Sequence, residues 1–388
     1  MITRVQVKNF RNLGDIDVQL GPLTVLVGRN GTGKSTFLDV LRFVRDALRL
    51  GLSTAINQRG GLYALCSWSP NGPTSDIEIS LEIEESEQKV RYSFAIGVNQ
   101  AGMLQVKHEF LELTLSSQQP VVKFETRGGK WVIQSLDYLV NHAHLINIPV
   151  ADSLMLSKLS VLEDLQAIQD TLTATNFYAV FPNTLREPQR QTSESALLED
   201  GQNLAVILRG IIRQKSFYAD LMAALKCVVA GVRDIRVQEV GGYLVTELKH
   251  EMQNSQETWF PLAQESDGTL RVLGLLTALY QGVPHSLIAI EEPELSVHPG
   301  ALAMLSEVIE EAATRSQIII TTQSPDLISR FKADQLRIVE RVGTETFIGP
   351  IEEGQQEAIN AQLFSAGDLL RIEGLHISTQ EEPVNYYA

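Results

Sequence analysis

Cysteine is scarce in this chain of 388 residues, which holds only Cys66 and Cys227. Two cysteines so far apart exclude a disulfide framework and every cysteine-based zinc motif, and we expect both thiols to be buried small side chains in a reducing cytosol. No apolar run approaches the roughly 18 residues that cross a bilayer. The first residues, MITRVQVKNF, also lack the basic and apolar regions of a signal peptide. The sequence therefore predicts a cytoplasmic protein without a membrane segment.

Basic residues are also in short supply, because 32 Lys and Arg stand against 47 Asp and Glu and give a net charge of −15. Such a surface excludes a general electrostatic grip on nucleic acid or on an anionic membrane, so any contact with nucleic acid must be local. Arg42, Arg45 and Arg49 share one face of an expected helix. That stripe is open to two interpretations, a contact with nucleic acid or an acidic partner, and a solvated face balanced by the nearby Asp39 and Asp46.

Both ends of the chain alternate between strand and helix patterns. Residues 2–10 alternate apolar and polar side chains, 23–27 form a continuous apolar run, and 35–50 repeat apolar residues at helical spacing. Near the other end the patterns predict helices over 269–280 and 300–314 and buried strands over 287–290 and 317–322. One α/β core with a mostly parallel sheet, assembled from both termini, is the fold that this order favours.

The middle of the chain differs in pattern and reads as an insertion. Residues 76–133 alternate like an antiparallel meander, with turns at Asn99–Gly102 and Arg127–Gly129. Helical spacing follows over 153–173 and 203–229, on either side of a polar stretch, 183–194, that we expect to be a loop, and strands follow over 235–248. We expect three parts: 1–150 and 261–388 as the two pieces of one lobe, and 151–260 as an inserted helical lobe. No internal repeat or long heptad run is present, so no extended coiled coil is expected.

The residues Gly28 to Ser35, GRNGTGKS, fit the pattern G-x-x-x-x-G-K-[ST] between a buried strand and a helix. Glycines let backbone N–H groups surround phosphate oxygens, and the helix N-terminus adds its positive dipole end. We expect Lys34 to neutralise the β- and γ-phosphates of ATP and Ser35 to ligate Mg²⁺. The loop residues expected to hold the nucleotide are Asn30, Gly31, Thr32, Gly33, Lys34, Ser35 and Thr36.

Two carboxylates follow the buried strand 287–290. Glu291 is expected in the Mg²⁺ shell and Glu292 as the group that activates the attacking water, because successive residues at a strand end point to opposite sides.

The residues Ser266, Asp267 and Gly268 precede an apolar helix and form a further anion site or a simple helix cap. With the two preceding motifs they look like the signature motif of an ATP-binding-cassette (ABC) ATPase, which completes the nucleotide site of a partner protomer. The familiar form is LSGGQ, and here Glu265, Asp267 and Thr269 replace its Leu, first Gly and Gln.

The opening VKNFRNLGDIDVQLGPLTVLVGRNGTGKST, together with SDGTLR, EEPELSVHP and QIIITTQSP, resembles the RecF, SMC and OLD branch of the cassette ATPases. The resemblance implies an ABC-ATPase P-loop head with an antiparallel β subdomain and an inserted helical lobe. It makes residues 294–298 the D-loop, where His298 faces the partner's nucleotide or simply starts a helix. The switch loop carries Gln323 where the family usually has a histidine, which implies slow or partner-gated hydrolysis. Gln58 is the candidate Q-loop glutamine that links metal to the helical lobe, with an ordinary loop glutamine as the alternative.

The resemblance implies a molecular switch that binds and hydrolyses Mg-ATP and forms a homodimer, or a higher oligomer, around two nucleotides. Compact relatives of this kind resemble ATPase subunits of bacterial anti-phage systems, so a separate nuclease or toxin is the expected effector. The 63 residues after QIIITTQSP are too few for a TOPRIM nuclease domain. Membrane transport is disfavoured because 232 positions separate Lys34 from Ser266. A RecF-like repair ATPase that binds DNA directly is the alternative.

Overall fold

The chain folds into two compact units in a computed structural model that describes residues 1–69, 72–73, 76–85, 88–115, 120–127, 130–133, 153–159, 163–252, 256–282 and 286–378. The first unit holds Met1–Thr175, Asp334–Ala358 and Leu375–Ala388, and the second holds Asn176–Ala333 and Ile359–Gly374. Of the expected part boundaries, the one at residue 150 lies outside the described residues and the one at 260 stays a prediction. None of the helices in these described ranges combines the length and the apolarity that crossing a bilayer requires.

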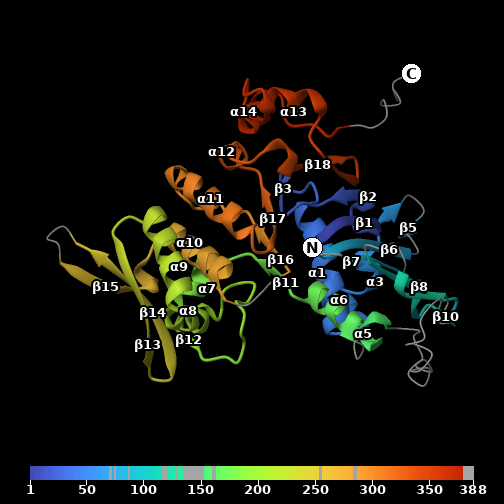
Figure 1. The fold of residues 1–388 in the computed structure, drawn as a ribbon, viewed down its shortest axis with the longest axis horizontal. Coiled ribbons are helices and arrows are strands. Elements are labelled where there is room, and N and C mark those ends of the chain that lie inside the picture. The colour runs from blue at the N-terminus through green and yellow to red at the C-terminus, as the bar shows by residue number, and fades with distance from the viewer. Residues whose placement is uncertain are drawn as a thin grey trace. The chain divides into compact units, whose positions relative to one another are not determined.

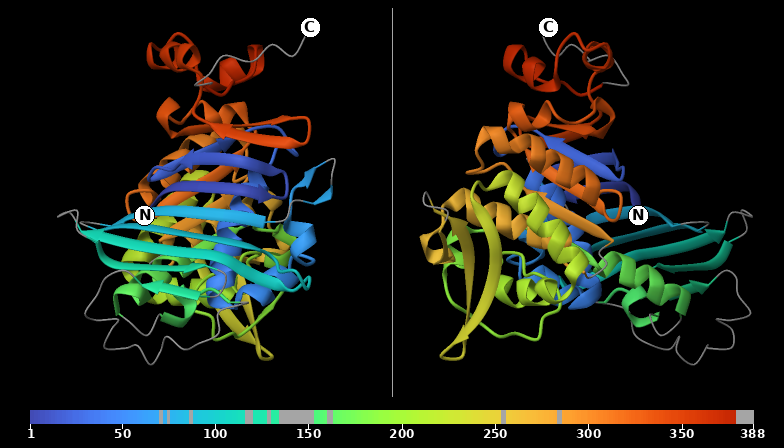
Figure 2. Two further views of the ribbon diagram at one scale, coloured as in Figure 1. Left: turned by 90° about the vertical axis from the view of Figure 1, so that its right-hand side faces the viewer. Right: turned by 60° about the vertical axis from the view of Figure 1, so that its left-hand side comes forward.

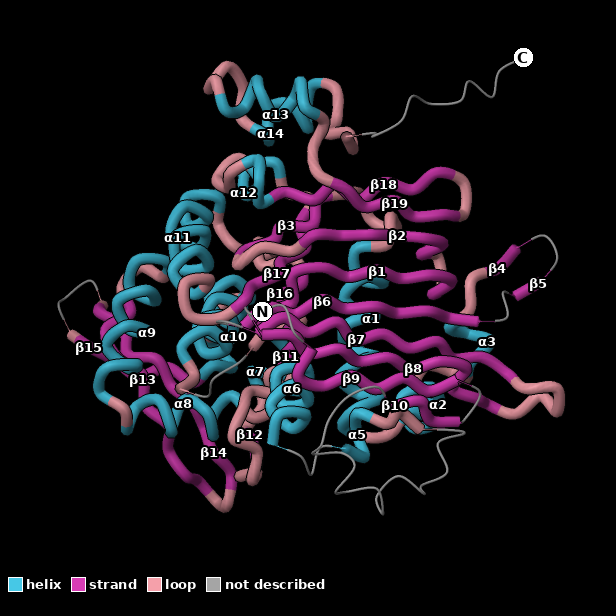
Figure 3. Tube along the Cα trace, turned by 45° about the vertical axis from the view of Figure 1, so that its right-hand side comes forward, coloured by secondary structure: helices cyan, strands magenta, loops and turns pink. Residues whose placement is uncertain are grey.

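A seven-stranded antiparallel sheet, ordered β10-β9-β8-β7-β6-β1-β2, forms much of the first unit (Figures 1 and 3). Its strands are β1 (Ile2–Phe10), β2 (Leu13–Gln19), β6 (Asp76–Glu85), β7 (Gln88–Val98), β8 (Leu104–Leu115), β9 (Pro120–Arg127) and β10 (Lys130–Ile133). This sheet confirms the expected meander, and Asn99 makes its first turn by accepting from the N–H groups of Ala101 and Met103. The second expected turn, at Gly128 and Gly129, lies outside the described residues.

The first unit also contains three strands that hold the phosphate-binding motif. The fully buried strand β3 (Leu23–Val27) pairs in parallel with β18 (Leu336–Val342), which pairs in antiparallel with β19 (Glu345–Gly349). The remaining elements are α1 (Lys34–Arg49), α2 (Leu52–Asn57), α3 (Leu62–Leu65), β4 (Trp68–Ser69), β5 (Gly72–Pro73), α5 (Leu156–Leu159) and α6 (Glu163–Thr173). The expected first helix is thus confirmed and begins one residue early.

Aromatic side chains join α1 to the seven-stranded sheet. The ring centroids of Phe43 on α1 lie 5.8 Å from Phe10 on β1 and 6.4 Å from Phe94 on β7. Tyr92, also on β7, continues the cluster 5.8 Å from Phe94. All four side chains are almost fully buried, so their large apolar surfaces fix the helix on the sheet. Figure 2 shows the strands of this sheet running side by side in its left panel.

The second unit combines a parallel strand pair with an antiparallel sheet. Its parallel strands, β16 (Leu287–Glu291) and β17 (Gln317–Thr322), have β11 (Thr175–Tyr178) beside β16. The antiparallel sheet consists of β12 (Gln189–Arg190), β13 (Val232–Val240), β14 (Tyr243–Glu251) and β15 (Glu257–Pro261). Its helices are α7 (Pro182–Arg186), α8 (Leu204–Arg213), α9 (Lys215–Val228), α10 (Asp267–Tyr280), α11 (Leu302–Ala312), α12 (Pro325–Ile328) and α14 (Ala366–Ile372), with the short 3-10 turns η2 (Leu262–Gln264) and η3 (Pro299–Ala301). Two further elements, η4 (Ala333–Gln335) and α13 (Glu353–Asn360), lie where the chain passes from one unit to the other.

Three expectations for the second unit are wrong. The polar stretch 183–194 is no simple loop, because Pro182 starts α7 and Gln189 pairs with Leu244 of β14. The single helix expected over 203–229 is two helices, since the backbone of Gln214 is extended. Cys227 is exposed, because it lies on the polar side of α9. The strands and helices expected from 269 to 322 are confirmed to within two residues at each end.

One buried acid ties the start of α5 to the sheet of the first unit. Glu109 on β8 is fully buried and accepts hydrogen bonds from the Tyr92 hydroxyl (3.0 Å) and from the N–H groups of Met155 (2.6 Å) and Leu156 (3.0 Å). Burial raises the pKa of Glu109 to about 7, although these three bonds oppose the rise.

We expect the free energy of unfolding to fall as pH rises from 4.5 to about 7. In this window the folded protein keeps the Glu109 proton and the unfolded chain, at the ordinary value of 4.5, has lost it. Glu109→Gln should remove about 3 kcal/mol of this pH dependence, measured by urea unfolding at pH 5 and pH 8. Glu112→Gln, on the same strand, is the control and should keep the wild-type slope. Equal slopes in wild type and Glu109→Gln would contradict the prediction.

Candidate nucleotide-binding site

The residues expected to act on ATP are divided between the two units. The loop at Gly28–Ser35 and Gln58 belong to the first unit, and the signature loop, Glu291, Glu292, His298 and Gln323 belong to the second.

The carbonyl groups of the phosphate-binding loop are held by donors from several parts of the first unit. Lys34, only 6% exposed, donates from Nζ to the carbonyls of Gly28 (2.7 Å) and Arg29 (2.9 Å). The carbonyl of Thr32 accepts from the hydroxyl of Thr346 (2.6 Å), and the carbonyl of Gly31 accepts from Arg341 (3.3 Å). These last two donors come from the β18–β19 hairpin, more than 300 positions along the chain. The loop therefore depends on a segment that no local pattern connects with it.

Two positions of the loop require glycine because residues of β18 and β19 lie too close to them for a side chain. A Cβ atom on Gly28 would lie 2.4 Å from the carbonyl oxygen of Val339. A Cβ atom on Gly33 would lie 2.6 Å from Thr346 Oγ1, and Gly33 also has a φ of +116°. No other residue type fits these two positions without displacing β18 or β19.

The backbone N–H groups of the loop are left to face an anion. Within the described ranges no acceptor is assigned to the N–H groups of Asn30, Gly31 and Gly33, and Gly33, the N-cap of α1, provides no side-chain cap. Uncapped N–H groups at the start of a sixteen-residue helix, with an ammonium group beside them, form a cradle for phosphate. Ser35 is exposed at the same helix end and carries the hydroxyl that a Mg²⁺ ion would require. The donor set thus fits Mg-ATP.

Behind the loop, α1 carries a buried network of ion pairs. Arg59 donates to Asp39 (3.0 Å) and to Asp46 (2.9 Å), its side chain is only 7% exposed, and its guanidinium lies 5.4 Å from the centroid of the Phe43 ring. Arg45 also pairs with Asp46 (2.8 Å). Of the arginine stripe, Arg45 is therefore engaged in this network, and its side chain is 12% exposed. Arg45 is therefore neither a nucleic-acid contact nor a solvated residue, because Asp46 beside it on α1 and the carbonyl of Thr175 (3.4 Å) hold its guanidinium.

Gln58, the candidate Q-loop glutamine, is exposed at the end of α2, where its N–H donates to the carbonyl of Thr54 (3.0 Å). It directly precedes Arg59. The ion-pair network therefore anchors the backbone beside Gln58 to the helix that starts at the phosphate-binding loop.

In the second unit, β16 ends at the expected acidic pair. Glu292 has a left-handed backbone with a φ of +46°, and its N–H donates to the carbonyl of Thr321 on β17 (2.9 Å). Strain of this kind in a residue other than glycine is characteristic of functional sites. Glu294 accepts a hydrogen bond from the Thr322 hydroxyl (2.5 Å), and burial raises the pKa of its carboxyl. One buried oxygen of Glu294 has no hydrogen-bond partner within the described residues.

The signature and D-loop segments touch each other in the second unit. A Cβ atom on Gly268 would lie 2.4 Å from the carbonyl oxygen of Ser296, whose φ is +61°. Ser266 caps α10 by accepting from the N–H of Thr269 (3.2 Å), which confirms the helix-cap interpretation. His298 is exposed and starts η3, where its Nδ1 accepts from the N–H of Gly300 (3.1 Å). The neutral imidazole therefore carries its proton on Nε2.

Gln323 is exposed between β17 and α12. Ser324 caps α12, and α14 is fastened to α12 by a hydrogen bond between Ser329 and Ser365 (3.0 Å) and by the ion pair of Arg371 with Asp326. A Cβ atom on Gly367 would lie 2.1 Å from the carbonyl oxygen of Pro325. The C-terminal Ser365–Asp368 segment is thus a capping box that packs against the helix after the switch loop.

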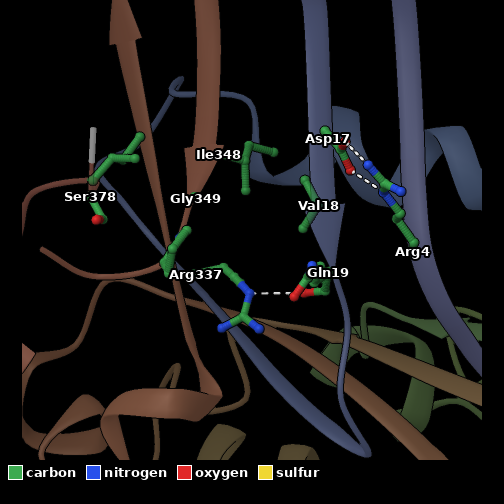
Figure 4. A pocket seen from close by; sticks show the side chains of 10 residues that line it. Arg4, Asp17, Val18, Gln19, Arg337, Ile348, Gly349 and Ser378 are labelled. Carbon is green, nitrogen blue, oxygen red and sulfur yellow. Dashed lines mark hydrogen bonds and ion pairs between the residues drawn. The ribbon is translucent and has the colours of Figure 1, made fainter. Parts of the chain in front are cut away.

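A cavity of about 420 Å³ lies elsewhere in the first unit, and none of the loop residues 28–36 lines it (Figure 4). Asp17 on β2 points there toward Arg4 and pairs with it. Arg337 donates to the carbonyl of Gln19 (2.8 Å) in the same view. Within the described residues no group of three His, Cys, Asp or Glu side chains is placed to hold a metal ion.

Sequence comparisons agree with these motifs. The family described as "AAA domain, putative AbiEii toxin, Type IV TA system" matches residues 23–329. Endonuclease GajA of Bacillus cereus (strain VD045) is 22% identical over 403 residues, which cover 96% of this chain and 65% of the endonuclease. OLD nuclease of Thermus scotoductus (strain ATCC 700910 / SA-01) is 59% identical over 44 residues, 11% of this chain and 8% of the nuclease. The chain therefore spans less than two thirds of either relative.

Solved structures show the same fold. An SMC head bound to the C-winged helix domain of ScpA superposes with a TM-score of 0.57 at 14% identity, covering 91% of this chain and 99% of that one. The Smc head domain with an extended coiled coil bound to the C-terminal domain of ScpA, derived from Pyrococcus furiosus, gives 0.51 at 13% identity, covering 93% and 99%. These likenesses confirm the expected ABC-ATPase head fold, and the relatives confirm the resemblance to the SMC and OLD branch.

Lys34→Ala should lower the affinity for ATP by about tenfold or more, because a charge-assisted contact to phosphate is lost. Titration with a fluorescent ATP analogue in the presence of Mg²⁺ measures the change. Lys226→Ala, an exposed lysine on α9, is the control and should bind as the wild type does. Far-UV circular dichroism checks that the variant is folded. Unchanged affinity in a folded Lys34→Ala protein would contradict the assignment of this loop.

Gly367→Ala should destabilise the contact of α14 with α12 by about 1–3 kcal/mol, because the added methyl group meets backbone at 2.1 Å. Hydrogen exchange of α12 and thermal unfolding measure the loss. Gly354→Ala is the matched control, since a Cβ atom there meets nothing within 4 Å. Equal exchange of α12 in the two variants would show that the packing is not required.

Proposed function

The chain belongs to this AAA-domain family, and we propose that it is a molecular switch that binds and hydrolyses Mg-ATP and controls a separate effector. The observation that carries the proposal is the phosphate-binding loop, in which the carbonyls of Gly28, Gly31 and Thr32 accept hydrogen bonds, while the N–H groups of Asn30, Gly31 and Gly33 have no acceptor assigned within the described residues. The family match spans 23–329 and so includes this loop as well as the acidic strand end and the signature segment.

In the proposed reaction, each residue that the sequence motifs single out has one role. Lys34 neutralises the β- and γ-phosphates, and Ser35, Glu291 and Gln58 hold the Mg²⁺ shell. The bound ion neutralises charge that develops on the phosphate oxygens. Glu292, whose carboxylate has no partner assigned in the described ranges, accepts the proton of the attacking water.

We further propose that two copies clamp two nucleotides, each held by the loop of one copy and by Ser266, Asp267 and Gly268 of the other. The exposed Nε2 of His298 is available to the same nucleotide as a donor. Gln323 senses the γ-phosphate with its amide, which donates a hydrogen bond without adding charge. ATP binding then favours the closed pair and hydrolysis releases it.

An effector with nuclease or toxin chemistry in anti-phage defence is the proposed target of the switch. The support is that two relatives are named as an endonuclease and a nuclease. The free thiols of both cysteines are in keeping with the cytoplasm as its location. Direct DNA binding is disfavoured by the net charge of −15 and by the ion pairs of Arg45.

Glu292→Gln should keep ATP binding and reduce hydrolysis by about a hundredfold or more, because general-base assistance is lost. Phosphate release measures the rate, and light scattering after gel filtration measures the mass with and without Mg-ATP. We expect the mass of this variant to double with nucleotide.

Glu307→Gln, which changes an exposed acid on α11, is the control and should hydrolyse ATP at the wild-type rate. Equal turnover in wild type and Glu292→Gln would remove Glu292 from the mechanism, and an unchanged mass would overturn the dimeric clamp.

A further inference from the structure

The signature loop of this chain carries a charge of the wrong sign for its proposed ligand. Asp267 stands at the first residue of α10, where the family pattern has glycine, and its side chain is 57% exposed. Within the described ranges no acceptor is assigned to the N–H groups of Asp267 and Gly268. A carboxylate beside these donors competes with a phosphate for them and repels it.

Arg186, at the end of α7, lies against this carboxylate. Its Nη2 donates to Asp267 Oδ1 (2.5 Å) and to the carbonyl of Glu265 (3.2 Å), and its Nη1 donates to Asn183 (2.9 Å). The Arg186 side chain is 27% exposed, so it is partly shielded from solvent. One arginine therefore holds both the main chain and the charged side chain of the signature segment.

The pair draws the Asp267 carboxylate toward α7. The described residues assign the carboxylate no partner other than Arg186, and the cap of α10 is supplied by Ser266 instead. His250 on β14 contacts the carboxylate of Glu265 (2.7 Å), the residue before Ser266. Glu265 is therefore held at its side chain by His250 and at its carbonyl by Arg186. A partly exposed ion pair contributes little to folding.

We propose that Arg186 neutralises Asp267 and so allows the signature loop to meet the phosphates of a nucleotide bound by a second copy of the chain. This inference rests on the proposed function, and it makes Arg186 a positioning residue. The pair Arg186–Asp267 takes the place of a neutral glycine: the carboxylate is kept, but its charge is cancelled and its Oδ1 accepts a hydrogen bond from Arg186.

A double-mutant cycle of Arg186 and Asp267 tests the proposal, with Glu292→Gln as the parent protein. The quantity compared is the dissociation constant of the dimer in Mg-ATP, measured by sedimentation velocity. Arg186→Ala should weaken the dimer about tenfold or more, because an unpaired carboxylate then faces the phosphates. Asp267→Asn should dimerise at least as well as the parent. The double variant Arg186→Ala/Asp267→Asn should recover to within about threefold of the parent, since no charge remains to be neutralised.

Arg209→Ala is the matched control, because Arg209 forms a surface ion pair with Glu239 in the same unit at similar exposure. It should leave the dimer unchanged, and the affinity of the phosphate-binding loop for a fluorescent ATP analogue, measured at protein concentrations at which the chain is monomeric, should be equal in all variants. A double variant as weak as Arg186→Ala, or an Arg186→Ala protein that dimerises like the parent, would overturn the role of Arg186. A parent that stays monomeric with Mg-ATP would overturn the proposed function, and this inference with it.

Discussion

Hydrogen bonds to the carbonyl groups of the phosphate-binding loop are the constraint on which the candidate site depends. A peptide chain presents N–H and C=O groups in equal number, so a loop can offer several N–H groups to an anion only if its carbonyls find other donors. Lys34 supplies two of these donors from within the loop, and Thr346 and Arg341 supply two from the β18–β19 hairpin. The hairpin approaches so closely that only glycine fits at Gly28 and Gly33. The motif glycines are thus required as much by the neighbouring strands as by the ligand.

The same device recurs in the second unit. Gly268 approaches the carbonyl of Ser296, and Gly367 approaches the carbonyl of Pro325. In each case a helix N-terminus is pressed against another chain segment at a position where a side chain would prevent the contact. The signature loop is thereby joined to the D-loop, and the C-terminal capping box to the helix after Gln323. Movement of either segment must therefore move its neighbour, which is the mechanical coupling that a nucleotide switch requires.

Local sequence patterns predicted the elements whose signal is contained in a short window. The buried strands β3, β16 and β17 and helix α1 could be placed to within a residue or two, because continuous apolar runs and helical spacing are local signals. The pairing of Thr346 with the loop could not be predicted, since a threonine in a hairpin gives no sign of a partner more than 300 positions away. Helix α7 could not be predicted either, because its five residues are too few to show a helical repeat of apolar side chains. Pro182 at its first position is the one local signal of a helix start.

The site residues divide along the same line. A motif identifies Lys34 and Ser35 because the residues that form the phosphate-binding loop are consecutive in the sequence. Arg59 and Arg186 escape notice because each acts through residues that are distant in sequence: Arg59 through Asp39 and Asp46, and Arg186 through Asp267.

Departures from a family motif nevertheless give a signal, because an unfavourable charge in a phosphate-facing loop calls for a counter-charge nearby. In the clamp that we propose, Asp267 is such a departure, and a basic side chain beside it is what that proposal requires. The sequence offers many arginines for that part, and only the fold selects Arg186, since α7 places it within hydrogen-bonding distance of both Glu265 and Asp267. A substitution within the motif thus indicates which charge needs a partner, and the tertiary structure shows which residue lies close enough to be that partner.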